Sequence, residues 1–288
     1  MGTSSGYGGP ATGLVPSWAD DPMPSAAPAP PLDGTVDPGI PGMRPAEPTP
    51  TMQPLPPQPD APGAGMLGGA RGSFTRFART GSRAALGRAL SNYVRHGTGG
   101  AWSAARRMGS SRGTGVRLLG VVRDFQGLGP AETLRRLNLP GLAGRPADQV
   151  FLALLEFLCP PGGAIDEAIA RQAMLDAIAD LAEAGVGSFE GMLPDQLQEF
   201  FLDFIARSIE GRVMADLAQR GVTIPDDVSM VEHAQQQLHD FVTGCTRGVL
   251  AGRLDGVGRL GDRDIERFIN AIYEAAFEVI AAAGEVAA

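Results

Sequence analysis

The chain has 288 residues, and all 24 of its basic residues are Arg, so it contains no Lys. This excludes chemistry that needs a Lys, such as a phosphate-binding loop or a Schiff base. Two Cys and three His are too few for a disulfide framework or a thiolate zinc site. No apolar run is long enough to span a membrane, and the first 20 residues lack the pattern of a secretory signal. We therefore expect a soluble, cytoplasmic protein.

Charge divides the chain into three segments. Residues 1–70 hold six acids and one Arg, whereas residues 71–123 hold eleven Arg and no acid. The remainder, residues 124–288, holds 26 acids and twelve Arg. The net charge of −8 thus conceals a strongly basic middle segment. We predict a disordered tail over 1–70, an Arg-rich helical arm over 71–126 and an acidic helical domain over 127–288.

The first segment is rich in Pro, Gly and Ala. Of the 24 Pro, 17 fall in residues 1–70, and residues 22–62 contain no aromatic residue. Such a segment cannot bury enough apolar surface to offset the entropy lost on ordering, which predicts disorder. Two parts of it stand out, namely the glycine-rich residues 1–10 and an apolar cluster at 14–18 that ends in Trp18.

The basic segment has enough apolar residues for short helices, which we predict over 74–94 and 101–108. Glycines at 97–100 and the Gly-Ser-Ser sequence at 109–111 are expected to break them. Arg76, Arg79 and Arg83 are three and four residues apart, which places them on one face of a helix.

The partner of this basic segment is open on sequence alone. Eleven cations with interleaved aromatic residues are typical of a surface that follows a nucleic-acid backbone. The same cations could instead contact an acidic protein surface, either the chain's own acidic domain or a partner's, or serve solubility alone. The candidate contact residues are Arg76, Arg79, Arg83, Arg106 and Arg107.

The acidic segment shows apolar residues at helical spacing in five stretches. The clearest run from 197 to 217, from 231 to 249 and from 265 to 280, and shorter ones lie at 150–158 and 165–181. Pro194, and the acids Asp262 and Asp264, mark expected helix starts. No stretch alternates with the period of a strand. The sequence therefore predicts an all-α protein with a C-terminal bundle of five to six helices.

Motifs that could carry catalysis or bind a ligand each have a simpler explanation. Residues 256–261 match the dinucleotide-binding pattern GxGxxG, but they lie between helical stretches, which favours a helix connection. His233 and His239 are six residues apart and do not share a helix face. Cys159 and Cys245 lie on apolar stripes, as buried thiols do. We predict no catalytic, metal or cofactor site, and expect a non-enzymatic protein.

The beginning of the chain carries the most specific signal. Met1 precedes the small residue Gly2 and should be removed, leaving the α-amino group of Gly2 as the one primary amine in a chain without Lys. This amine titrates close to cellular pH, so a reactive neutral fraction is present. An enzyme that ligates to amines would have a single target here, and we identify Gly2 as a candidate modification site.

Several segments together resemble a known family. The opening MGTSSGYGGP, the following LVPSW, the segments YVRHGTGG and AARRMGSS, and residues 135–171 are similar to the QatB component of Qat anti-phage defence systems. The resemblance implies a cytoplasmic system of four proteins: an ATPase, this protein, a QueC-like enzyme called QatC and a TatD-like nuclease.

QueC-like enzymes work on 7-deazaguanine bases, and relatives in defence systems are thought to ligate such a base to the N-terminal glycine of a partner. The resemblance therefore implies that Gly2 accepts a 7-deazaguanine-type adduct and that no other cofactor is bound. The residues expected to contact the QueC-like partner are Thr3, Ser4, Ser5, Tyr7, Gly8, Gly9 and Trp18. The alternative function is a nucleic-acid-binding protein that acts through residues 71–123.

Overall fold

All regular structure in the described part of the chain is helical, as the sequence predicts. The computed structural model describes residues 66–162, 164–218, 227–250, 253–254 and 256–288. Within these ranges the backbone forms helices joined by turns and no β-sheet. The predictions made for residues 1–65 lie outside the described residues.

The basic segment forms four α-helices and one π-helical turn. They are α1 (Gly68–Thr80), α2 (Arg83–Asn92), the π-turn Tyr93–Gly97, α3 (Ala101–Arg106) and α4 (Gly109–Leu128). The helical character of this segment is thus confirmed, whereas several of its boundaries differ from the prediction.

The predicted helix over 74–94 is divided in two. Gly81 adopts a left-handed conformation with φ 63°, and its N–H donates to the carbonyl of Phe77, which ends α1. The side chain of Ser82 then accepts a hydrogen bond from the N–H of Ala85 and caps the start of α2. A glycine and a capping serine in sequence therefore interrupt a stretch whose apolar spacing alone favours one helix.

Residues 109–111 were predicted as a break and instead form the first turn of α4. This helix buries a face of small residues, with Ser111, Thr114 and Gly115 near its start. A Cβ atom added to Gly115 would lie 3.4 Å from Cδ1 of Ile269 and 3.7 Å from Cδ1 of Ile205. The small residues therefore allow α4 to pack closely against two neighbouring helices.

The acidic segment contains the helices that its apolar stripes predict. They are α5 (Pro130–Arg136), α6 (Ala147–Ala153), α7 (Leu155–Leu158), α8 (Ile165–Glu183), α9 (Pro194–Ala218), α10 (Val228–Leu250) and α11 (Asp262–Ala287). The predicted starts at Pro194 and Asp262 are confirmed. The stripe over 150–158 is divided between α6 and α7, and α5 was not predicted.

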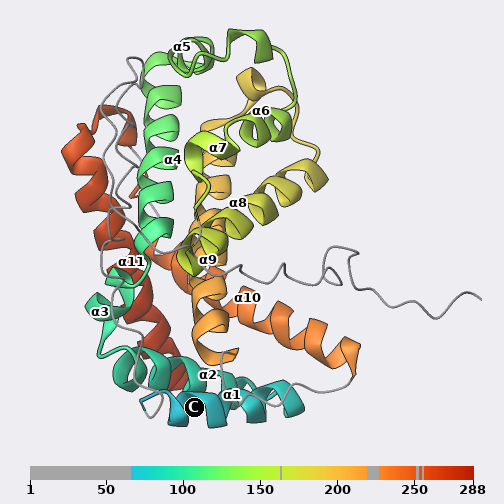
Figure 1. Cartoon of the computed structure of the whole chain (residues 1–288), viewed down its shortest axis with the longest axis vertical. Helices are drawn as coiled ribbons and strands as arrows, with labels where there is room; N and C mark the ends of the chain where they lie inside the picture. The colour runs from blue at the N-terminus through green and yellow to red at the C-terminus, as the bar shows by residue number, and fades with distance from the viewer. Residues whose placement is uncertain (1–65, 163, 219–226, 251–252, 255) are drawn as a thin grey trace, which may run out of the picture. The chain divides into compact units, whose positions relative to one another are not determined.

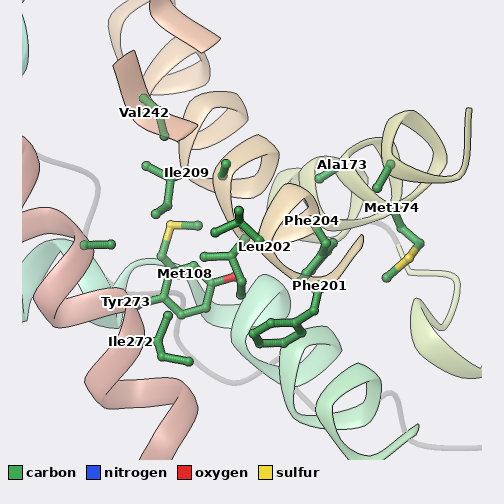
Figure 2. Close-up of a cluster of buried hydrophobic side chains, with 14 of the residues drawn as sticks. Met108, Ala173, Met174, Phe201, Leu202, Phe204, Ile209, Val242, Ile272 and Tyr273 are labelled. Atoms are coloured by element: carbon green, nitrogen blue, oxygen red, sulfur yellow. The ribbon is translucent and has the colours of Figure 1, made fainter. Parts of the chain in front are cut away.

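Helices of both segments build one core. The long helices α4, α9 and α11 lie side by side, α8 and α10 pack against α9, and α1 and α2 cross the ends of α9 and α11 (Figure 1). Phe77 and Tyr93 of the basic segment belong to the same buried cluster as Phe204 and Tyr273 of the acidic segment. Figure 2 shows part of this cluster, where side chains from α8, α9, α10 and α11 are directed inward.

Because the basic and acidic segments share one core, the domain boundaries predicted from sequence do not match the folded unit. The predicted boundary between residues 126 and 127 falls in the last turn of α4, so it separates no folding units. The predicted tail over 1–70 also extends too far, because Leu67 and Ala70 are buried in the core. The basic segment is helical, but its helices are part of the bundle.

Candidate functional site

Most Arg residues of the basic segment contact other parts of the same chain. Arg95, Arg107 and Arg123 form ion pairs with Glu285, Asp216 and Asp262, respectively. Arg71, Arg88 and Arg117 donate to main-chain oxygens at Asp216 and Leu217, at Ala288, and at Leu158. The chain's own acidic segment is therefore a major partner of the basic segment, which was one of the alternatives from sequence.

Asp216 on α9 is the centre of a buried polar cluster. Its Oδ2 accepts hydrogen bonds from Tyr93 Oη at 2.9 Å and Arg107 Nη2 at 3.1 Å, and lies 3.5 Å from Arg212 Nε. Arg212 also pairs with Asp166 on α8. Burial and the nearby Asp216 carboxylate raise the pKa of Tyr93, which keeps its hydroxyl protonated as a donor.

This cluster changes the set of candidate contact residues. The side chain of Arg107 is 7% exposed and lies against an internal carboxylate, so it is not available to an external phosphate or partner. Its neighbour Arg106 is exposed. Asp216 and Arg212 had no role in the sequence analysis, because they lie far along the chain from Arg107 and follow no local motif.

Arg76, Arg79 and Arg83 are exposed, as a contact role requires. The break at Gly81 places Arg76 and Arg79 on α1 and Arg83 at the first position of α2. Across the part of the chain that the structure describes, these three side chains form no ion pair. They remain candidates for an external acidic group.

A second basic surface lies where α3, α4 and α11 meet. Trp102 is 57% exposed, and the guanidinium of Arg106 lies 4.6 Å from the centroid of its indole ring. The spacing of four residues on one helix allows this cation–π contact. Beside it is a hollow of about 320 Å³, lined by Trp102, Ala105, Arg106, Arg112, Asn270 and Glu274.

A larger cleft of about 480 Å³ separates α8, α9 and α10. Leu181, Phe200 and Leu202 contribute apolar atoms to it. The polar and charged side chains that line it are Asp180, Asp195, Gln196, Glu199, Asp203, His239, Thr243 and Arg247. Sequence analysis did not bring these residues together, because they come from three different helices.

The charged groups of this cleft are largely paired. His239 Nδ1 lies 3.0 Å from Glu210 Oε2, and this hydrogen bond raises the pKa of the imidazole. Burial raises the pKa of Asp203, although Arg207 Nε donates to its carboxylate at 2.8 Å and opposes the shift. Arg207 also pairs with Asp180. The lining of the cleft therefore combines apolar side chains with charges that are mostly paired, which suits binding of a partly apolar group.

Cys159 is buried, as predicted, whereas Cys245 is only half-buried, and the glycine motif connects two helices as expected. Burial raises the pKa of the Cys159 thiol, and it raises that of Cys245 to about 11, so both favour the protonated, less nucleophilic form. Residues 256–261 lie between α10 and α11 and include the 3-10 turn Val257–Arg259. In the described ranges, no three His, Cys, Asp or Glu side chains form a group that could hold a metal ion. None of the described helices has the length and hydropathy of a membrane span.

Comparison with protein families gives a match that covers most of the described helices. A family model described as Qat anti-phage system associated protein QatB matches residues 99–280, which is more than half of the chain. The chain belongs to the QatB family. It is therefore a component of an anti-phage defence system. Neither the curated proteins nor the solved structures contain a match to the chain.

The QatB match extends from just before α3 into α11. It includes the Trp102 hollow, the buried Arg107 and the cleft at His239. Of the segments that carry the resemblance, AARRMGSS and residues 135–171 lie within the match, whereas those at the beginning of the chain lie outside it. The predicted modification site, Gly2, lies outside the described residues. So do the predicted partner-binding residues Thr3, Ser4, Ser5, Tyr7, Gly8, Gly9 and Trp18.

Proposed function

We propose that this QatB chain is a non-enzymatic binding component of its defence system, bound and modified at Gly2 by a QueC-like partner. The observation that carries the proposal is the absence of Lys from all 288 residues. A ligase directed at amines would find no side-chain competitor for the α-amino group of Gly2. The expected product is a 7-deazaguanine-type adduct on that amine.

The residue types around Gly2 suit such a reaction. Glycine leaves the α-carbon unhindered, and Thr3, Ser4 and Ser5 are small enough for a narrow enzyme cleft. Tyr7 supplies one aromatic group that a partner can hold. A bulky residue at position 2 would obstruct the amine and would also retain Met1, which moves the amine by one residue.

Two features of the folded part support a binding role. The ionisable groups that line the cleft between α8, α9 and α10 are mostly held in ion pairs, as His239 is with Glu210 and Asp203 is with Arg207. The molecule also presents an exposed Trp102 with a stacked Arg106. Exposed aromatic and Arg side chains are typical of protein interfaces.

A second candidate function is nucleic-acid binding through the basic segment. The exposed Arg76, Arg79 and Arg83 favour it, because they have no ionic partner in the described part of the molecule. Against it stands the number of Arg residues in this segment that contact the chain itself. A surface that binds the phosphate backbone of a nucleic acid needs several cations that are free to displace the counterions of that backbone.

The test of the Gly2 proposal is intact-mass spectrometry of the protein from cells that carry the whole Qat system. We expect a mass increase that maps to Gly2, and we expect Gly2→Glu to abolish both this increase and phage protection. Gly2→Ala keeps position 2 small and should retain Met1 removal. Gly13→Glu adds the same charge eleven residues further along and should leave modification and protection unchanged.

The outcome that would refute modification is a bare Gly2 amine in cells that resist phage. Full protection by Gly2→Glu would refute it as well. Loss of protection by Gly13→Glu would show that the loss of protection in Gly2→Glu results from the added charge in this segment and not from a change at the acceptor amine.

A further inference from the structure

Arg112 on α4 differs from the other half-buried Arg residues of the basic segment. Its Nε is buried and has no hydrogen-bond partner, and across the described ranges its guanidinium forms no ion pair. Arg117, about one turn further along α4, is also half-buried but donates from Nε to the carbonyl of Leu158 at 2.8 Å. Burying an Nε–H group without an acceptor is costly. The rest of the guanidinium is not enclosed, because Arg112 is half-buried and lines the hollow described above, where an added anion can reach it.

The surroundings of Arg112 form a binding site of suitable size. The hollow of about 320 Å³ lies beside the exposed indole of Trp102. Arg106 is held over that indole at 4.6 Å, which limits the orientations of its guanidinium. Asn270, from α11, adds an amide to the lining. Two guanidinium groups and an amide thus meet next to one large aromatic surface.

The hollow also has an excess of positive charge. Glu274 is the acidic residue in its lining, and it forms no ion pair with Arg106 or Arg112 in the structure as described. Two cations therefore face one carboxylate. One further negative group would balance the charge, and a volume of this size admits a side chain.

We propose that this hollow is a docking site for an acidic segment of a partner protein. An Asp or Glu carboxylate of the partner binds Arg112 and Arg106, and an adjacent apolar side chain packs on Trp102. Trp and Arg are the residues that most often dominate the energy of protein interfaces. The proposal goes beyond the modification of Gly2 and does not depend on it.

The surrounding charges favour a protein segment over a nucleic-acid strand. Glu274 lines the hollow, and α11 exposes Glu266 and Glu278 together with Arg263 and Arg267, so the charge around the hollow is mixed. A nucleic-acid strand carries a negative charge at every nucleotide and needs a run of cations, which this mixed surface does not provide. A protein segment can place one carboxylate in the hollow and neutral residues beside it.

Trp102 itself provides the readout. The chain has two Trp, so 5-fluorotryptophan incorporated into this chain alone gives two fluorine NMR signals, and Trp102→Phe identifies the one that belongs to Trp102. We would titrate the full-length labelled chain, with Trp18 unchanged, with each of the other unlabelled Qat proteins. We expect the Trp102 signal to shift with one of them, because docking removes the indole from water. Adding Arg112→Gln or Arg106→Gln should weaken that binding by at least about tenfold. Arg145→Gln, which changes an exposed Arg on the turn before α6, should leave it unchanged.

Three results would overturn the proposal. One is affinity within twofold of the parent for both Arg106→Gln and Arg112→Gln. Another is the absence of any shift with every Qat protein. The third is a shift produced by single-stranded DNA with a steep dependence on salt, which would assign the surface to nucleic acid. The same titration with Gly2→Glu separates the two proposals, because the shift should persist when modification is lost.

Discussion

Substitution of Asp216 tests the buried cluster that joins the basic and acidic segments. The Asp216 side chain is 5% exposed and is the shared acceptor for Tyr93 and Arg107. In Asp216→Ala, the Arg107 guanidinium, itself 7% exposed, loses its carboxylate partner, and Tyr93 loses its acceptor. Removing one partner of a buried ion pair costs about 3–5 kcal/mol, because the remaining charge loses the carboxylate that offset its desolvation.

Urea denaturation followed by circular dichroism measures this cost. With a denaturant slope of about 2–3 kcal/mol per molar, the midpoint should fall by about 1–2.5 M. Asp216→Asn keeps an acceptor oxygen but loses the charge, so its midpoint should lie between those of Asp216→Ala and the parent. Glu199→Ala removes an exposed pair with Arg247, in which both side chains are 60% exposed, and should cost less than about 1 kcal/mol.

The reasoning would be refuted if Asp216→Ala and Glu199→Ala had the same midpoint. Such a result would mean that water or a rearranged side chain compensates Arg107, and that the cluster is not closed to solvent.

Three further predictions concern the core, the cleft and the basic surface. Phe204 is fully buried, so Phe204→Ala should lower the free energy of unfolding by about 3–5 kcal/mol, and a loss below about 1 kcal/mol in urea denaturation would contradict its placement. The pKa of His239 is raised by its acidic partner on α9, so its stabilisation is complete below the ordinary imidazole pKa and is lost as pH rises through the raised value. The stability difference between the parent and His239→Gln, less than about 1 kcal/mol, should therefore shrink as the pH rises above the ordinary imidazole pKa of about 6.5, and a difference that grows would show the opposite sign. Replacing all three residues of the set Arg76, Arg79 and Arg83 by Gln should leave DNA binding at about 150 mM salt no tighter than micromolar, as in the parent, and nanomolar binding by the parent in a filter-binding assay would favour the nucleic-acid alternative.

The acidic helices were predictable because local patterns determine them. Apolar residues recur at helical spacing in α9, α10 and α11, and Pro194 and Asp262 mark two of their starts. Helix α4 was missed because its first buried positions are Ser111, Thr114 and Gly115, which hydropathy patterns do not count as a core. Its burial results from the close approach of Ile205 and Ile269, which lie far away in the sequence.

The environments of the Arg residues in the basic segment could be predicted from the sequence only in part. Arg106 and Arg107 are neighbours and equivalent in composition, yet one stacks on Trp102 and the other is buried against Asp216. The first contact has a sequence signal, because Trp102 and Arg106 are four residues apart on a helix. The second has none, since Asp216 is 109 positions away. The excess of Arg in the basic segment is visible in the sequence. Only the fold shows which of these Arg residues contact the chain itself and which are exposed to a partner.

The contacts of α1 and the π-turn define how much of the chain is needed for folding. Arg71 donates to the last carbonyls of α9, and Tyr93 donates to Asp216, yet both residues lie outside the 99–280 range that matches the QatB model. A fragment cut at those limits would leave the end of α9 without these donors and uncover the face of α11 on which α2 packs. The segment by which the family is recognised is therefore shorter than the unit that folds. Experiments that separate the N-terminal residues from the helical body should retain the chain from about residue 66, where the described structure begins.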